Sequence, residues 1–301
     1  MNFDKAYDLA VNFLKANIVF ALWGHPGIGK SALGQLLSDN YNLEFIDIRL
    51  GQIDPVDLNG FVHKDEKHGT FDYLPWARFP LEDTPLPPGK DGWLIMFDEV
   101  NTAPRQNLAA SYKIFLDRAV GSRKLHPRCR LMMGGNLVGE GLAGALPSPL
   151  VSRGAHIVMT PELTPTVKKI LGPGIAGFLS NYPKFIYQET QEANTPFPTL
   201  RTWEMVSNYE KKIGVATLEA LSCIVGSAAA VSYISYQQQT KNLTTLLSGI
   251  EMFPLDKAQD LLEYLAVDVT ELDKQLHRFP NEWHTIAKVR SEAIKAAELA
   301  T

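Results

Sequence analysis

Short apolar segments alternate with amphipathic segments over the first half of the chain. Five apolar segments have the length of buried strands, and they span residues 18–24, 43–49, 92–98, 130–136 and 155–160. Few of their internal positions are charged, which is typical of strands covered on both faces, whereas half-exposed strands alternate apolar and polar residues. The pattern predicts an α/β fold in which a parallel five-stranded sheet is flanked by helices.

The connection between the second and third apolar segments, residues 51–91, is longer than an ordinary loop and contains structural signals of its own. Asp54 and Pro55 can begin a short helix that ends at Gly60, because Asp accepts hydrogen bonds from free amides and Pro is tolerated in the first turn. We interpret residues 51–91 as an insertion into the sheet domain.

A hairpin is expected next in this insertion, because apolar residues 61–63 and 70–74 flank a polar turn. Several aromatic side chains lie in the hairpin and after it. They either pack the insertion onto the core or stay exposed to contact a partner, and we expect packing for half of them. These side chains are Phe71, Tyr73, Trp76 and Phe79.

Strand-like segments end after Pro161, and the rest of the chain has the periodicity of helices. The expected helices span residues 165–171, 201–213, 215–239, 255–265 and 281–300. Tripeptides rich in Gly and Pro, at 172–174 and 196–198, are expected to form turns between them. We therefore expect two domains, an α/β core at residues 1–160 and a helical lid with a C-terminal helical extension at residues 161–301.

The first apolar segment runs into a glycine-rich motif. Residues 24–31 read GHPGIGKS and match the pattern G-x-x-x-x-G-K-S/T between a strand and a helix, a context that separates the motif from a chance glycine-rich turn. Its backbone amides can point at phosphate oxygens, while Lys30 neutralises the β- and γ-phosphates and Ser31 ligates Mg²⁺. The motif predicts that the chain binds ATP with magnesium. The residues expected to line the nucleotide are Gly24, His25, Pro26, Gly27, Ile28, Gly29, Lys30, Ser31 and Ala32.

Two acidic residues end the third apolar segment, where WLIMF is followed by Asp98 and Glu99. Asp98 is expected to complete the Mg²⁺ shell together with Ser31, and Glu99 to orient and polarise the attacking water as a general base. A strand that ends in two acids is common, so this pair alone does not separate a structural from a catalytic role. Beside the phosphate loop it predicts an ATP hydrolase.

With Asn136 at the end of the fourth apolar segment, these motifs resemble the AAA+ ATPase superfamily, and more narrowly its MoxR-like and dynein-related branch. Residues 98–104, DEVNTAP, are similar to that branch's stretch after the second acid, and the insertion lies where the branch carries one. The resemblance covers about residues 17–208. It implies a P-loop sheet of strand order 5-1-4-3-2, a helical lid and a ring that is usually hexameric.

The resemblance implies a role for one polar residue in each domain. Asn136 corresponds to the first sensor, a side chain between the nucleotide and the attacking water, although an Asn after a strand is otherwise a turn residue. Arg201, at the start of a lid helix, corresponds to the second sensor, which contacts the γ-phosphate. The dipole at a helix N-terminus disfavours a cation, which speaks against a purely structural arginine there.

Arg153, in the segment 146–154, resembles the arginine finger that is presented to the neighbouring subunit. Such an arginine offsets charge on the γ-phosphate in the transition state, an effect worth about 10³ to 10⁵ in rate in related systems. A surface salt bridge is the alternative. Members of the branch often carry Phe after this arginine, whereas this chain has Gly154, which leaves the local packing open. Three other arginines are alternative fingers, namely Arg123, Arg128 and Arg130.

Composition narrows the classes of partner. The formal net charge of −4 provides no chain-wide positive field for nucleic acid or anionic lipid. Cys129 and Cys223 are too few and too far apart in sequence for a disulfide framework or a thiolate metal cluster, which suits a reducing compartment. Residues 1–17 read as an amphipathic helix and not as a signal peptide, and no segment approaches the ~20 apolar residues that span a bilayer. We therefore expect a cytoplasmic protein.

The favoured function is that of a MoxR-type motor, as the resemblance implies. We expect a ring, usually a hexamer, that uses ATP hydrolysis to remodel or activate a client protein, with a von Willebrand factor A-domain protein as a candidate partner. An AAA+ motor acting on nucleic acid, a translocase or a restriction-type motor, would share the same chemistry, because fold and nucleotide site do not define the substrate. A nucleotide switch without turnover would lack a catalytic element, and both Glu99 and Arg153 are present.

Overall fold

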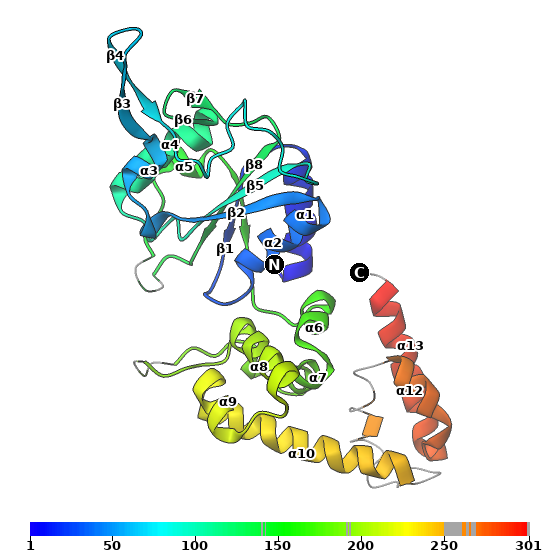
Figure 1. Ribbon diagram of the computed structural model, residues 1–301. Coiled ribbons are helices and arrows are strands. Elements are labelled where there is room, and N and C mark those ends of the chain that lie inside the picture. Colours follow the sequence, from blue (N-terminus) through cyan, green and yellow to red (C-terminus); the bar gives the residue numbers. More distant parts are fainter. Residues whose placement is uncertain are drawn as a thin grey trace. The chain divides into compact units, whose positions relative to one another are not determined.

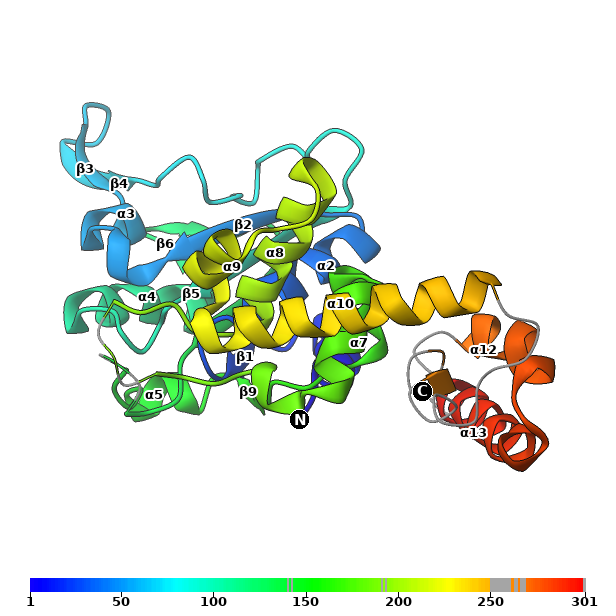
Figure 2. The same ribbon diagram turned by 90° about the horizontal axis from the view of Figure 1, so that it is seen from below.

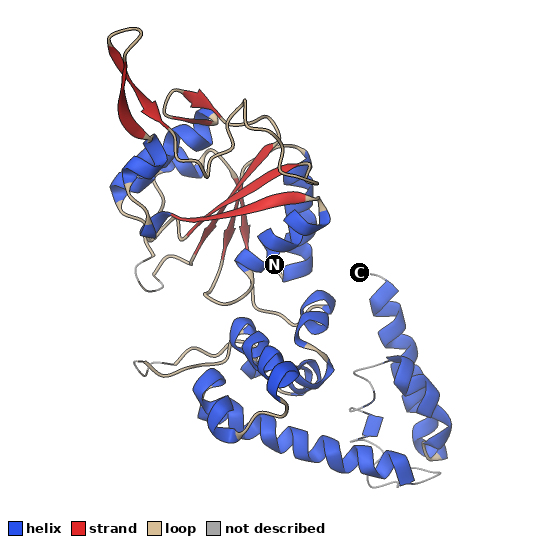
Figure 3. Cartoon of the chain, in the orientation of Figure 1, coloured by secondary structure: helices blue, strands red, loops and turns tan. Residues whose placement is uncertain are grey.

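The computed structural model describes residues 1–139, 141, 143–190, 192, 194–249, 261–262, 265 and 269–299. The chain divides into two compact units, Met1–Glu162 and Leu163–Thr301. Among the described residues, strands occur in the first unit, and the second is built from helices and loops (Figure 3). Of the helix expected at 255–265, only residues 261–262 and 265 are described, so most of that prediction lies outside the described residues.

One parallel sheet of five strands forms the centre of the first unit (Figure 1). Its strands are β1 (Phe20–Trp23), β2 (Leu43–Arg49), β5 (Gly92–Asp98), β8 (Cys129–Gly135) and β9 (Ala155–Val158). They lie in the order β2-β5-β8-β1-β9, and every neighbouring pair is parallel. Counted in chain order within the sheet, this is the expected order 5-1-4-3-2, so the predicted fold class is confirmed. The residues that follow β1, β5 and β8 therefore meet at one edge of the sheet.

The two edge strands differ from the prediction that all five strands are covered on both faces. β5 is buried from Gly92 to Phe97, as its continuous apolar run requires. In contrast, β9 is fully buried only at Ile157, and β2 exposes Glu44 and Arg49. An edge strand has a neighbour on one side only, so its outer positions reach solvent.

Helices cover both faces of this sheet (Figures 1 and 2). One face is covered by α1 (Phe3–Lys15) and α2 (Lys30–Asn40), and the other by α3 (Pro55–Asn59), α4 (Arg105–Asp117) and α5 (Ser148–Val151). The predicted amphipathic helix at the N-terminus is α1. It buries a stripe of residues three or four positions apart, as an amphipathic surface helix does. These residues are Phe3, Ala6, Ala10 and Leu14.

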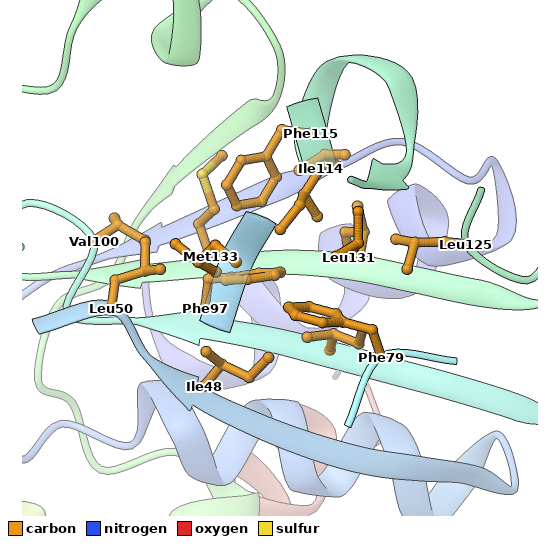
Figure 4. Close-up of a cluster of buried hydrophobic side chains, with 14 of the residues drawn as sticks. Ile48, Leu50, Phe79, Phe97, Val100, Ile114, Phe115, Leu125, Leu131 and Met133 are labelled. Carbon is orange, nitrogen blue, oxygen red and sulfur yellow. The ribbon is translucent and has the colours of Figure 1, made fainter. Parts of the chain in front are cut away.

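A cluster of buried apolar side chains in the first unit lies between the sheet and α4 (Figure 4). At its centre Phe97 of β5 contacts Phe79 and Phe115, with ring centroids 6.4 and 4.9 Å apart. Phe79 belongs to the insertion and is only 2% exposed, and Leu58 of α3 is buried in the same cluster. Large aromatic side chains dominate the energetics of such cores. The insertion is therefore anchored in the core at both ends.

The predicted hairpin of the insertion is present and projects from the body of the unit (Figures 1 and 2). It consists of two antiparallel strands, β3 (Phe61–Asp65) and β4 (Thr70–Leu74). Its two aromatic side chains, Phe71 and Tyr73, are 67% and 37% exposed. Trp76 and Phe79, which follow the hairpin, pack against the core instead. The expectation that half of these four aromatic side chains pack is confirmed.

The second unit has its own apolar core. Its helices are α6 (Pro165–Leu171), α7 (Pro173–Asn181), α8 (Leu200–Ile213), α9 (Leu218–Val225), α10 (Ser227–Gly249), α12 (Val269–Gln275) and α13 (Asn281–Leu299). The ring of Phe178 lies 5.3 Å from that of Trp203 and 5.2 Å from that of Tyr233. Trp203 Nε1 donates to Phe185 O at 2.7 Å, which satisfies the polar atom of this buried ring. None of the described helices is both long and apolar enough to cross a membrane.

Two helix predictions for this unit are wrong in detail. α7 begins at Pro173, inside a tripeptide that predicts a turn, because Pro is also favoured at the first helical position. The single helix expected at 215–239 is instead two helices, α9 and α10. Gly226 separates them, since its φ of 82° is left-handed and a Cβ there would lie 2.5 Å from Pro196 O.

Candidate functional site

The loop between β1 and α2 has the backbone of an anion-binding loop. α2 begins at Lys30, and Gly29 before it has a left-handed φ of 98°, while Gly27 has a φ of 78°. An L-residue with a Cβ adopts this conformation at a cost of about 1–2 kcal/mol, so glycine is favoured at both positions. The first amides of a helix have no partner within it and can donate to an anion at its N-terminus. The start of α2 is therefore suited to hold phosphate.

Lys30 is buried at the start of α2, with 8% exposure. Its Nζ donates to Gly24 O at 2.6 Å, to His25 O at 2.9 Å and to Asn136 Oδ1 at 3.0 Å. A buried ammonium group is tolerated only when its donors are satisfied, and here they are satisfied by the loop itself and by the residue after β8. The contact with Asn136 brings together two site residues that are 106 positions apart in the sequence.

Ser31 and Asp98 are joined by a hydrogen bond. The Ser31 hydroxyl donates to Asp98 Oδ2 at 3.0 Å, and Asp98 Oδ1 accepts the amide of Glu99 at 2.8 Å. A hydroxyl and a carboxylate are oxygen ligands of the kind that Mg²⁺ prefers, and Mg²⁺ takes most other ligands from water and substrate phosphates. No group of three or more His, Cys, Asp or Glu side chains among the described residues is arranged to hold a metal. The oxygens of Ser31 and Asp98 are thus of the kind that Mg²⁺ prefers.

Glu99 has a backbone conformation that few residues adopt. Its φ is 57°, and non-glycine residues in this region are uncommon and cluster at functional sites. Thr102 holds the turn, because its amide and its hydroxyl both donate to Glu99 O, at 3.1 and 3.0 Å. The carboxylate lies beside the turn after β2, where a Cβ on Gly51 would be 3.7 Å from Glu99 Oε2. This side chain thus has a defined place next to Asp98.

A third carboxylate, which the sequence analysis missed, lies on β2 beside this pair. Burial raises the pKa of Asp47, and the carboxylate of Asp98 raises it further. Asp47 Oδ1 is buried and has no hydrogen-bond partner among the described residues, while Arg49 Nε lies 3.8 Å from Oδ2. The signal was a charged residue inside the apolar segment 43–49. Negative charge therefore accumulates at this edge, where a divalent cation would offset it.

Two glycines make room for the side chains around Asn136. A Cβ on Gly134 would lie 2.6 Å from Asp98 Oδ1, and a Cβ on Gly135 would lie 2.7 Å from Asn101 Oδ1. Glycine inside a strand often marks a place where another group approaches closely. The signal in the sequence was the Gly-Gly pair directly before Asn136. The pair lets side chains from the end of β5 and the turn after it reach β8.

Arg153 lies at the opposite end of the sheet from the phosphate loop of its own chain. It precedes β9, and Ala155 of β9 pairs with Phe20 at the start of β1, whereas the phosphate loop follows the end of β1. Its side chain is exposed. The structure does not bring Arg153 together with Lys30 of the same chain, and the role of arginine finger stays a prediction.

The segment that carries Arg153 is fixed to β1. Trp23 Nε1 donates to His156 Nδ1 at 2.8 Å, so Nδ1 is unprotonated and the proton on Nε2 donates to Val151 O at 2.8 Å. A Cβ on Gly154 would lie 3.0 Å from Val19 O. Glycine at this position therefore allows the main chain of the segment to lie close to Val19, directly before β1.

The three alternative fingers are engaged within the first unit. Their partners are Asp83 for Arg123, the carbonyl of Asp91 for Arg128 and the carbonyl of Leu14 for Arg130. Arg128 and Arg130 also lie at the start of β8, at the end opposite Asn136. These contacts give the three guanidinium groups a role in the fold.

Arg201 lies in the second unit as the second residue of α8. Thr199 caps this helix, because its hydroxyl accepts the amide of Thr202 at 3.1 Å, and Thr202 Oγ1 accepts the amide of Thr199 at 2.8 Å. The Arg201 side chain is exposed. The start of the helix is well defined, and the role of second sensor stays a prediction.

No family model matches the chain, and no curated protein matches it. Among solved structures, the chain is similar to the crystal structure of a candidate ATPase from Cytophaga hutchinsonii. The sequence identity is 14% and the TM-score 0.38, over 93% of this chain and 78% of that chain. Similarity at this level carries no argument about function. A functional assignment therefore has to rest on the strand order and on the geometry of the loop after β1.

Proposed function

We propose that this chain is an ATP hydrolase of the AAA+ superfamily, in its MoxR-like branch, which works as a ring and remodels or activates a client protein. Two contacts support this proposal most strongly, Lys30 with Asn136 and Ser31 with Asp98. They join the loop after β1 to the ends of β8 and β5. Ligands of open α/β sheets bind at this carboxyl edge.

ATP is proposed to bind with its phosphates against the loop and the start of α2. Lys30 exchanges carbonyl acceptors for β- and γ-phosphate oxygens, and the first amides of α2 donate to others. Magnesium supplies charge neutralisation at the phosphates when it is bound. Ser31 and Asp98 are the residues that would hold it, since their oxygens already lie 3.0 Å apart.

Glu99 is proposed as the general base. Its carboxylate accepts a proton from the attacking water, the water oxygen bonds to the γ-phosphorus, and the bond to the bridging oxygen breaks to release ADP and phosphate. Asn136 orients the reacting groups from the other side, beside Lys30. Thr102 holds the main chain from which the Glu99 side chain extends.

Arg153 is proposed to act on the nucleotide of a neighbouring chain. Its distance from the phosphate loop of its own chain supports a ring, in which each site is completed by the next subunit. Arg201, at the start of α8, is proposed to contact the γ-phosphate as the second sensor. In this arrangement hydrolysis in one subunit is coupled to the next, because a cation at the γ-phosphate stabilises the transition state there.

The client is proposed to contact the hairpin formed by β3 and β4. This hairpin exposes a cluster of apolar side chains, and exposed apolar patches mark sites of protein contact. The exposed residues are Phe61, Val62, Phe71, Tyr73 and Leu74. A partner with a von Willebrand factor A-like domain follows from the resemblance alone.

The direct test of the proposed chemistry is the variant Glu99→Gln. It should bind ATP as the native protein does, while hydrolysis falls by ~10²-fold or more, because the base is lost and the shape is kept. Phosphate release and calorimetric ATP binding measure the two effects. The matched control is Glu44→Gln, an exposed carboxylate on β2, which should keep full turnover. Native turnover in Glu99→Gln would overturn the assignment of the base.

The proposed ring is tested by mixing two inactive variants, Arg153→Ala and Lys30→Ala. A mixed ring contains interfaces with an intact phosphate loop on one side and an intact Arg153 on the other, so part of the ATPase activity should return. Each variant alone should stay inactive. If no mixture regains activity although the chains assemble, the finger is not Arg153.

A further inference from the structure

Asn101 is a buried polar residue in the turn that follows β5. The function proposed above gives it no role. It is 6% exposed. Its amide nitrogen donates to Asn136 O at 2.8 Å and to Gly144 O at 3.3 Å, while its Oδ1 accepts the amide of Asn136 at 3.1 Å. One side chain therefore satisfies both main-chain polar groups of Asn136.

The two hydrogen bonds between Asn101 and the main chain of Asn136 hold a residue that lies beyond the strand pairing of the sheet. The pairing of β5 with β8 ends at Phe97 and Met133, and β8 itself ends at Gly135. Asn136 thus lies beyond the last ladder pair, and a planar amide bonded at two points sets its orientation. Its own side chain then accepts from Lys30 Nζ at 3.0 Å. A chain of contacts leads from Asn101 through Asn136 to the ammonium group of the phosphate loop.

Gly135 has no side chain, and this leaves room for Asn101 to reach Asn136. A Cβ on Gly135 would lie 2.7 Å from Asn101 Oδ1 and 2.4 Å from the ring of Trp23, closer than real Cβ contacts. Asparagine is also the side chain that fits the two partners. An aspartate would set a second carboxylate oxygen against the carbonyls of Asn136 and Gly144, with no donor for either.

We infer that Asn101 is a positioning residue, which holds Asn136 in the place where it acts on ATP and thereby sets the rate of hydrolysis. The inference rests on the proposed function, in which Asn136 orients the reacting groups. The hydrogen bonds of Asn101 go to Asn136 and Gly144 and not to the phosphate loop, so its loss leaves the affinity for ATP nearly unchanged. Residues that orient a functional side chain from behind typically contribute ~10- to 100-fold to activity.

The experiment compares Asn101→Ala and Asn101→Asp with the native protein. Each variant should lose ~10- to 100-fold in kcat while the Kd for ATP stays within about threefold, because the phosphate contacts are intact. Asn101→Ala combined with Asn136→Ala should lower kcat little further than Asn136→Ala alone. That non-additivity is the readout that a merely structural role does not produce, since independent sites add.

Asn107→Ala is the matched control. Asn107 is 3% exposed and donates to Leu50 O and Ile53 O, both at 2.6 Å, so its loss removes a comparable pair of buried hydrogen bonds. It bonds no atom of Asn136, and its effect on kcat should add in full to that of Asn136→Ala. Should Asn101→Ala not fold, the nearly isosteric Asn101→Asp takes its place, because it removes the donor without leaving a cavity, and should show the same non-additivity.

The outcomes separate the inference from the proposed function. If the native protein hydrolyses ATP and Asn101→Ala keeps its kcat, or adds in full to Asn136→Ala, the inference is overturned and the proposed function stands. If the native protein itself does not hydrolyse ATP, the proposed function fails and the inference fails with it. A loss in kcat that vanishes in the Asn136→Ala background supports both.

Discussion

The carboxyl edge of the sheet and the hairpin of the insertion belong to one unit but are built in opposite ways. At the edge, polar side chains bond to one another and to the backbone, as Lys30 does with Asn136 and Ser31 with Asp98. On the hairpin, apolar side chains such as Phe71 are exposed. The edge is organised by its own residues, whereas the hairpin leaves apolar surface for another molecule to cover. This difference supports assigning the chemistry to the edge and the partner to the hairpin.

The difference has an energetic side. An unsatisfied buried polar group costs about 1–3 kcal/mol of stability. A substitution at the edge therefore also affects the residues that lose a hydrogen bond to the substituted side chain. A substitution on an exposed surface usually changes stability by no more than about 0.5 kcal/mol. Variants at the edge should therefore alter activity and stability together, and variants on the hairpin should alter neither in the isolated protein.

The largest effect is expected from the same substitution made at two phenylalanines of the insertion, one in the core and one on the hairpin. Phe79→Ala empties the centre of the core and should lower the free energy of unfolding by about 3–5 kcal/mol. Phe71→Ala removes the same ring from the exposed hairpin and should change it by no more than about 0.5 kcal/mol. Denaturant unfolding of both variants measures the difference. Equal losses of stability would show that Phe71 packs as tightly as Phe79, and would contradict the proposed difference between the hairpin and the core.

A second contrast concerns turnover. Asp98→Asn should lower kcat by ~10²-fold, because it removes the charge that holds magnesium. Replacement of residues 62–73 by two glycines should leave basal kcat within about twofold, since Phe61 and Leu74 are paired neighbours that a short turn can join. Steady-state phosphate release checks both. A hairpin deletion that abolished basal hydrolysis would place the chemistry and the hairpin in one functional element.

How much of this molecule the sequence predicts depends on how local the cause is. The five strands follow from short segments rich in apolar residues, and the start of α3 from Asp54 and Pro55, whose capping is local. The strand order came from the resemblance and not from the apolar pattern. The break at Gly226 was not predicted, and part of its environment is distant in the sequence, since a Cβ there would lie 2.5 Å from Pro196 O, thirty positions earlier.

The site divides in the same way. The roles of Lys30 with Ser31, and of Asp98 with Glu99, are predicted from the sequence because each pair belongs to one contiguous motif. Asn101 and Asp47 were missed, since their partners lie on neighbouring strands and appear only once the sheet is assembled. The sequence signals they left, a Gly-Gly pair before Asn136 and an acid within an apolar strand, acquire meaning only with the strand order.

The smallest predicted effect tests the charge at the edge. The pKa of the Asp47 carboxyl is raised in the folded protein, which means that the fold favours the protonated form. The stabilisation that this form contributes is present below the unfolded pKa of ~3.9 and is lost as pH rises through the folded pKa. At neutral pH the ionised carboxylate therefore destabilises the fold. Asp47→Asn should raise stability at pH 7 without magnesium, by less than about 1 kcal/mol since the side chain is 33% exposed, and the gain should vanish below pH 4. Thermal unfolding as a function of pH measures it, and a lower Tm at pH 7 would contradict the assigned sign.

The central claim is that the loop after β1 holds a triphosphate through Lys30. Calorimetric titration with ATP and magnesium tests it most directly, with Lys30→Ala as the comparison and thermal unfolding to show that both proteins are folded. The native chain should bind ATP with measurable heat, and Lys30→Ala should bind it at least ~100-fold more weakly, because the buried ammonium that meets the phosphates is gone. Absence of binding by the folded native chain, or equal binding by both, would contradict the claim.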